Sequence, residues 1–408
     1  MDTNQNKSKQ LLSERVVRME ESATLAMAKL GRNLKEKGVD VITLSVGEPD
    51  FFTPDFVKDA AKKAIDENYS FYSPVCGYPD LKKAIANKLK RDNGLDFSSE
   101  QIVVSNGAKQ SIANVFLAII GEGDQVIVPA PYWVSYTELI RLADGEPVCI
   151  DATIENDFKV TPAQIEAAMT PNTKAFIFSS PCNPTGSLYS KQELHEIAKV
   201  IAKQPDVIVI SDEIYEHINF VGKHESIAQF EELKDRVVVI NGVSKAFAMP
   251  GWRIGYMAAP MEIVKACDKI QGQITSGASS IAQRASLAAI EKDPAEIAEL
   301  KTMLEAFRVR RNLVVSMLKE IPGLKVNVPE GAFYVFINVA EYFGKSDGET
   351  IISNDNDLCM YLLNKGHVAL VPGSAFGSPE CIRISYATSD DKLKEACVRI
   401  KNTLANLR

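Results

Sequence analysis

Short apolar runs alternate with amphipathic stretches along the middle of the chain. The apolar runs favour strands at residues 101–105, 125–129, 174–179, 207–211, 236–240 and 253–258. Several of these runs are β-branched without polar alternation, which is typical of strands buried on both faces of a mostly parallel sheet. Residues 191–203 show a helical pattern that opens with a capping box, Ser190 and Glu193. Strands that alternate with helices predict an α/β layered domain.

The last third of the chain predicts a smaller α+β domain. A long helix is expected over 295–320, because a proline and a glycine follow it at positions 322 and 323. Strands are expected at 332–339, 368–371 and 381–386, with a variable stretch at 344–356, a short helix after it and a last helix over 390–407. A lone strand at 41–46 precedes the central series. We therefore predict a large domain at 54–305 and a small domain made of 1–53 together with 306–408.

Composition narrows the class of protein. The chain has 408 residues, of which 46% are hydrophobic and 24% charged, so it can bury large cores and is not a disordered or disulfide-scaffold protein. Its net charge of −7 argues against nucleic-acid or anionic-membrane partners. The seven cysteines are scattered without a C-x-x-C pair, and the four histidines form no H-E-x-x-H motif. We expect a reducing compartment and no protein-built metal site.

Location follows from two further features of the sequence. The first ten residues are polar and lack the apolar core of a signal peptide. The chain also holds no run of eighteen apolar residues, so no membrane span is expected. These features predict a cytoplasmic protein.

Three loops that follow predicted strands carry candidate binding residues, because ligands of open α/β sheets bind at the carboxyl ends of the strands. Gly107, Ala108 and Lys109 open a helix after 101–105, where backbone N–H groups can bind an anion or merely form a tight turn. Trp133 follows 125–129 and can stack on a planar ligand or pack in the core. Asn183 lies between two prolines after 174–179, in a loop built for a site or as a rigid turn.

Three charged side chains are candidates for chemistry. Asp212 ends a buried strand and needs a cationic or donor partner there, unless it only caps a helix. Lys245 lies among small and apolar residues, where desolvation lowers the pKa of an amine and makes it a nucleophile; the alternative is a surface lysine. Arg383 lies between two isoleucines and can grip a carboxylate, or else solubilise an edge strand.

Taken together, these stretches resemble the fold-type I, class I pyridoxal-phosphate aminotransferases, and among them the bacterial aspartate aminotransferase branch. The resemblance runs over nearly the whole chain and is carried by segments 45–54, 106–110, 131–136, 180–186, 211–217, 244–256 and 383–389. It implies a large domain with a mostly parallel seven-stranded sheet between helices, and a homodimer that shares its active sites.

The resemblance also implies roles for single residues. Lys245 would form a Schiff base with pyridoxal phosphate and shuttle the proton at the substrate α-carbon, and Asp212 would pair with the pyridine nitrogen. The other cofactor contacts would come from Tyr215 and Asn183 at the phenolic oxygen, Trp133 at the ring face, and Gly107, Ala108, Lys109, Arg253 and Tyr72 around the phosphate, with Tyr72 reaching in from the partner subunit. Substrate binding would fall to Gly47, Lys109, Trp133, Asn183 and Arg383.

The reaction implied by the resemblance moves the amino group of aspartate to 2-oxoglutarate through a pyridoxamine form, in ping-pong order. Arg383 and Lys109 would bind the two carboxylates. An aromatic, alanine or prephenate aminotransferase and a pyridoxal-phosphate-dependent β-lyase remain alternatives. Glu20 occupies the position at which prephenate-using relatives carry a lysine, which argues against prephenate. Pro250 replaces a common threonine, and its missing N–H predicts slightly weaker cofactor binding.

Overall fold

The computed structural model describes residues 11–408. The polar decapeptide, on which the prediction of no signal peptide rests, lies outside the described residues. Among residues 11–408, no helix is both long and apolar enough to cross a membrane.

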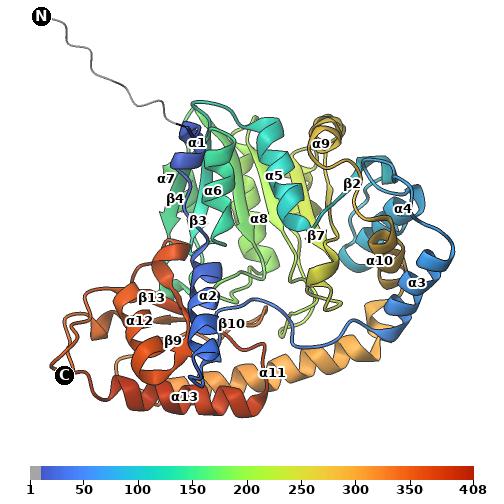
Figure 1. Ribbon diagram of the computed structural model, residues 1–408. Helices are drawn as coiled ribbons and strands as arrows, with labels where there is room; N and C mark the ends of the chain where they lie inside the picture. The colour runs from blue at the N-terminus through green and yellow to red at the C-terminus, as the bar shows by residue number, and fades with distance from the viewer. Residues whose placement is uncertain (1–10) are drawn as a thin grey trace, which may run out of the picture.

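A seven-stranded sheet forms the centre of the larger part of the molecule (Figure 1). Its order is β2-β8-β7-β6-β5-β3-β4, and only β8 runs antiparallel to its neighbours. The strands are β2 (Ile102–Ser105), β3 (Gln125–Ala130), β4 (Glu146–Asp151), β5 (Thr173–Ser179), β6 (Ile208–Asp212), β7 (Val237–Gly242) and β8 (Gly255–Ala258). This confirms the predicted fold class and the strand series within one or two residues at most ends.

Helices cover both faces of this sheet, which explains the unbroken apolar runs. In β5, Phe176 and Phe178 pack into one core, whereas Ala175 and Ile177 pack into the other, as the two-residue period of a strand requires. The first core also holds side chains of α3 (Asp55–Asp66), α4 (Pro79–Lys88), α7 (Pro162–Ala168), α8 (Lys191–Ala202) and α10 (Ser280–Glu291). The second holds side chains of α5 (Ala108–Ile119), α6 (Ser135–Leu142) and α9 (Met261–Ile274).

Two details of this sheet differ from the sequence-based prediction. Strand β4 was not expected, because it is an edge strand with mostly exposed or half-buried side chains and no continuous apolar run. Strand β8 begins at Gly255 rather than at position 253, since Arg253 has a left-handed backbone with a φ of 56°. The predicted capping box at Ser190 and Glu193 is present at the start of α8.

The smaller part combines both ends of the described chain. Strand β1 (Ile42–Thr43) pairs in parallel with β11 (Val368–Ala369), and a four-stranded antiparallel sheet has the order β12-β13-β10-β9. Its strands are β9 (Lys325–Val326), β10 (Tyr334–Asn338), β12 (Val371–Pro372) and β13 (Cys381–Ser385). The helices are α2 (Ala23–Glu36), α12 (Asp355–Gly366) and α13 (Asp390–Leu404). Helix α1 (Glu14–Val17) does not join them: it lies beside α6 of the larger part, where Arg15 is ion-paired with Asp144 (Figure 1). With twelve residues, α12 is longer than the short helix expected there.

Helix α11 (Ala298–Lys319) runs beneath both parts, as the lower edge of Figure 1 shows. It begins three residues later than predicted, after a 3₁₀ turn at Pro294–Glu296. Leu300 packs into the core of the large sheet, whereas Met303 and Phe307 pack into the core of the smaller part. The boundary at 305/306 that we propose therefore falls inside one continuous helix, close to the point where its side chains change from one core to the other.

Candidate active site

The candidate residues lie where strands of the large sheet end, and in segments of the smaller part that reach toward those ends. Asp212 is the last residue of β6, and Lys245 follows β7 by three residues. Gly107, Trp133 and Asn183 follow β2, β3 and β5 by two, three and four residues. Because the parallel strands end at one edge of the sheet, residues far apart in the chain come together there.

Lys245 is half-buried, and its amine donates a 2.6 Å hydrogen bond to the carbonyl oxygen of Gly47. Burial is the main cause that lowers the pKa of this amine to about 8; the charge of Glu48 opposes the shift, and the Arg253 and Arg383 guanidinium groups add to it. The surface-lysine alternative is thus excluded. An amine with this pKa is partly neutral near physiological pH, so it can act as a nucleophile or a base.

Asp212 is buried and has two donors. The hydroxyl of Tyr136 donates to Oδ2 at 2.6 Å, and the N–H of Ile214 donates to Oδ1 at 3.3 Å. Burial raises the pKa of Asp212 to about 6 against these hydrogen bonds. Tyr136 also packs edge-on against Trp133, with ring centroids 5.5 Å apart. Sequence reasoning missed Tyr136, and no helical spacing reveals it: Trp133 precedes α6, so only the fold brings the two rings together and the Tyr136 hydroxyl to Asp212.

An anion cradle forms between the start of α5 and Arg253. Gly107 has a φ of 84°, and a Cβ there would overlap the Arg253 guanidinium. Arg253 donates to the carbonyl oxygens of Pro250 at 2.9 Å and Asn106 at 3.3 Å. A Cβ on Gly255 would overlap the backbone of Ala108, so a glycine lets β8 approach the helix start closely. Free N–H groups of the first helical turn therefore lie beside a guanidinium.

Arg383 lies on the inner strand β13, with 2% of its surface exposed, which excludes the edge-strand alternative. It donates to Asn183 Oδ1 at 2.9 Å and to the Ser45 carbonyl at 2.5 Å, while its Nε has no partner. The guanidinium carbon lies 4.5 Å from the Tyr334 ring centroid and 4.8 Å from that of Phe376. A buried guanidinium with an unused donor can still receive a carboxylate.

Tyr215 extends the site through a residue that the sequence did not reveal. Its hydroxyl forms a 2.8 Å hydrogen bond with the hydroxyl of Tyr334 on β10. A Cβ on Gly47 would overlap the Tyr334 hydroxyl, so Gly47 is required for this close approach. No motif singles out Tyr334, because it lies in an ordinary apolar strand, and only the fold brings it to Tyr215.

Lys109 and Tyr72 occupy the outer parts of the predicted site. The amine of Lys109 lies 5.0 Å from the Trp133 ring centroid, and desolvation followed by the charge of Arg253 lowers its pKa. Tyr72 is 97% exposed, and within residues 11–408 of one chain it forms no hydrogen bond with another predicted site residue. The single chain therefore brings together all the predicted site residues except Tyr72.

The chemistry of these residues fits pyridoxal phosphate. The cradle of Gly107, Ala108 and Arg253 suits a phosphate dianion. A Cβ at position 107 would overlap the Arg253 guanidinium and fill this space. A partly neutral amine at Lys245 suits an aldehyde, and a buried carboxylate at Asp212 suits a protonated ring nitrogen. The unused Nε of Arg383 leaves a donor for a substrate carboxylate.

Known proteins agree with this geometry. The family model described as "Aminotransferase class I and II" matches residues 39–400. An aspartate aminotransferase of Pinus pinaster is 47% identical over 400 residues, which cover 97% of this chain and 81% of that one. An aspartate/prephenate aminotransferase of Cereibacter sphaeroides is 47% identical over 399 residues, covering 97% and 99%.

Solved structures lead to the same family. The aspartate aminotransferase of Rhizobium meliloti has a TM-score of 0.93 at 42% identity and covers 97% of this chain and 99% of its own. The Thermus thermophilus enzyme with maleate has a TM-score of 0.91 at 39% identity, covering 97% and 100%. This chain therefore belongs to the class I and II aminotransferases, and it is a pyridoxal-phosphate-dependent enzyme.

Proposed function

We propose that this aminotransferase moves the amino group of aspartate to 2-oxoglutarate in ping-pong order. The observation that carries the proposal is a second cation: Lys109 stands over Trp133, in addition to the buried guanidinium of Arg383. A dicarboxylic amino acid needs one cation for each carboxylate. The relatives whose names specify aspartate support the same substrate.

We assign the bond-making and proton-transfer roles to three residues. When bound, pyridoxal phosphate supplies an electrophilic carbon and a ring that accepts electrons from the substrate α-carbon. Lys245 takes the proton from that carbon as a base and later returns it as an acid, a role supported by its lowered pKa. The Asp212 carboxylate holds a proton on the ring nitrogen, and the Tyr215 hydroxyl donates to the phenolic oxygen.

The remaining residues bind and orient. Arg383 takes the α-carboxylate, with Asn183 holding the guanidinium in place through their hydrogen bond. Lys109 takes the side-chain carboxylate. The other predicted contacts of cofactor and substrate fall to Gly47, Gly107, Ala108, Trp133 and Arg253.

A half-reaction tests the substrate. Holoenzyme mixed with aspartate alone is expected to release one equivalent of oxaloacetate, and 2-oxoglutarate is then expected to regenerate the starting cofactor absorbance. Lys109→Met is expected to lower kcat/KM for aspartate about tenfold, the equivalent of about 1.4 kcal/mol, with little effect on alanine. The absence of oxaloacetate would contradict the proposal. Release of pyruvate and ammonia from a cysteine conjugate without a keto acid would instead identify a β-lyase.

Prephenate is a second candidate substrate, because relatives 45–48% identical are named aspartate/prephenate aminotransferases. Glu20 opposes it, because this exposed carboxylate stands where the resemblance leads us to expect a lysine; its backbone N–H donates to Glu138 at 2.9 Å. A carboxylate at this position cannot supply the cationic contact that a lysine would give to a substrate carboxylate. We expect transamination of prephenate to be weak and to rise in Glu20→Lys, which product analysis with glutamate as the donor can measure.

We further propose a homodimer in the cytoplasm. Phe71 and Tyr72 are 82% and 97% exposed, and large exposed aromatic residues are typical of an interface. Seven free thiols support a reducing compartment. Light scattering is expected to give twice the chain mass, and Tyr72→Phe is expected to weaken cofactor binding even though Tyr72 projects away from its own subunit. A monomer with unchanged cofactor affinity would contradict the dimer.

A further inference from the structure

The turn that carries Asp212 and Tyr215 also carries two glutamates, Glu213 and Glu216, which bind a different set of partners; we call their side of the turn the rear. Glu213 and Glu216 each follow one of those residues by one position, so both pairs share a spacing of three. The N–H of Glu216 donates to the Glu213 carbonyl at 3.0 Å, which closes the turn. Glu213 and Glu216 are 1% and 6% exposed. Two buried carboxylates that bind nothing in the reaction require an explanation.

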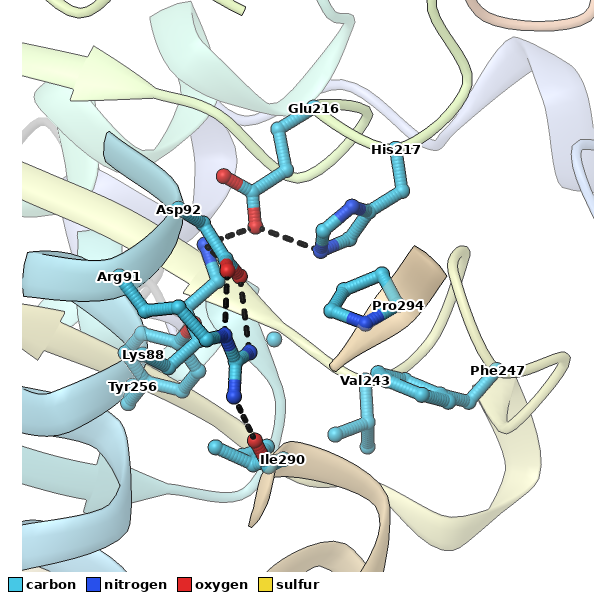
Figure 2. Close-up of a pocket in the computed structure, with 11 residues that line it drawn as sticks. Lys88, Arg91, Asp92, Glu216, His217, Val243, Phe247, Tyr256, Ile290 and Pro294 are labelled. Carbon is cyan, nitrogen blue, oxygen red and sulfur yellow. Dashed lines mark hydrogen bonds and ion pairs between the residues drawn. The ribbon is translucent and has the colours of Figure 1, made fainter. Parts of the chain in front are cut away.

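Lys88, the last residue of α4, is ion-paired with Glu216, and both side chains are 4% exposed. Figure 2 shows this carboxylate between Lys88 and His217, whose Nε2 is 3.0 Å away. Asn93 completes the set: its amide donates to Glu216 at 2.9 Å, and its oxygen accepts from Lys88 at 2.9 Å. Lys88 directly precedes a π-helical turn, Leu89–Asn93, and Asn93 ends it; this rare geometry accompanies the convergence of both side chains on one carboxylate.

Glu213 has its own partners. The hydroxyls of Ser211 and Ser226 donate to it at 2.8 and 2.6 Å, and His224 Nε2 lies 3.0 Å away. Burial disfavours the charged imidazole, yet the Glu213 carboxylate raises the pKa of His224 overall.

The ligand atoms of Glu213, Glu216 and His224 lie within 4.8 Å of one another, a spacing that suits a metal ion. Lys88, whose ammonium also lies 3.8 Å from Asp92, already supplies the cation.

A small cavity of about 10 Å³ connects this cluster with the loop that carries Lys245. Lys88, Glu216 and His217 line one side of it, and Val243 and Phe247 line the other (Figure 2). The cavity is about the size of one water. The cluster around Glu213 and Glu216 is therefore part of segment 211–217 and faces segment 243–247 across this cavity.

Stability alone does not account for the Lys88–Glu216 pair. Removing two charges from water costs several kcal/mol per ion, and apolar replacements of buried pairs are often as stable or more stable. The ion pair and the Asn93 amide do hold the Glu216 side chain in one orientation, because their hydrogen bonds are directional. Catalytic residues need such a fixed orientation, since a small displacement of a reacting group lowers the reaction rate strongly.

We propose that Lys88 is a positioning residue of the aminotransferase reaction: by holding Glu216 on the rear of the turn, it fixes the Tyr215 hydroxyl and the Asp212 carboxylate on the front. This inference rests on the roles proposed above for Tyr215 and Asp212. It does not depend on which amino acid is the substrate.

The test is Lys88→Met, with Lys82→Met as the matched control. Lys82 is also on α4 and is 8% exposed, but it faces the sulfur of Cys76 at 3.5 Å. In Lys88→Met we expect about tenfold lower affinity for pyridoxal phosphate, about tenfold lower kcat and an unchanged KM. The pH midpoint of the bound cofactor's absorbance should rise, since a misplaced Tyr215 no longer stabilises the deprotonated form. Lys82→Met should leave all four values at the parent level.

Further variants keep the inference falsifiable. Lys88→Arg retains the charge and should recover the parent midpoint, while Glu216→Gln should reproduce Lys88→Met without adding to it in the double variant. A lower melting temperature with unchanged midpoint and cofactor affinity would overturn the inference and leave a structural role only. If Lys88→Met does not fold, the midpoint of Glu216→Gln decides. A parent enzyme that fails with aspartate refutes the proposed substrate but leaves these cofactor measurements valid.

Discussion

At the residue scale, the pKa of Lys245 governs how the protein captures its cofactor. Burial lowers this pKa from 10.5 to about 8, and only the neutral amine attacks an aldehyde. The rate at which apoprotein binds pyridoxal phosphate covalently should therefore rise between pH 7 and 8 and level off above pH 9. Stopped-flow absorbance measures this, with free lysine as the control, whose rate should continue to rise toward pH 10. A protein rate that also continues to rise would contradict the lowered pKa.

Asp212 is expected to destabilise the apoprotein that it serves. The pKa of Asp212 is about 6 in the folded protein, above the usual 3.8. The contribution of this group to the free energy of unfolding is therefore present at low pH and is lost as the pH rises through 6. Asp212→Asn removes this loss, and the apoprotein should gain about 3 kcal/mol at pH 7 and nothing at pH 4. Denaturant unfolding at the two pH values measures it, and equal gains would contradict the assignment. The holoenzyme of the same variant should lose most of its kcat.

At the element scale, the start of α5 depends on close approach. Gly107→Ala places a Cβ against Arg253 at a φ of 84°, so it should weaken cofactor binding as well as strain the backbone. Gly38 is a matched control, because it has the same φ of 84° and no atom within 4 Å of an added Cβ. Both variants should lose about 1 kcal/mol of stability, but only Gly107→Ala should lose cofactor affinity. Equal affinities in a fluorescence titration would contradict the cradle.

Elements differed in how well the sequence predicted them. The inner strands were predicted because both faces are buried, which leaves long β-branched runs. Strand β4 was missed because an edge strand carries exposed side chains. The π-helical turn after Lys88 was not anticipated either, because its side chains bind Glu216, a residue far away in the sequence.

At the scale of the whole molecule, Arg310 on α11 links the segment before α3 to the start of α13. It is 8% exposed, and it donates to Asp50 at 2.7 Å and to Asp390 at 3.1 Å. Arg310→Met should cost about 2 kcal/mol, because both carboxylates keep some access to water. KM for the amino donor should rise more than kcat falls, since the segment bearing Gly47 loses its anchor.

Helix α11 offers a control for that variant. Arg308 forms an exposed pair with Glu305 on the same helix, with side chains 43% and 64% exposed. Arg308→Met should change stability by less than about 0.5 kcal/mol and leave KM unaltered. Similar losses in both variants, in denaturant unfolding and steady-state kinetics, would show that Arg310 has no special role.

The sequence by itself determined the large α/β sheet, the order of the loops at its edge and the residue types that carry the chemistry. Local patterns encode these features: strand periodicity, the capping box of α8 and motifs such as the one around Lys245. The tertiary structure alone decided which distant side chains complete them. Tyr136, Tyr334 and Lys88 are ordinary in sequence and become neighbours of Asp212, Tyr215 and Glu216 only when the chain folds. Such contacts form through space, so no local pattern can predict them.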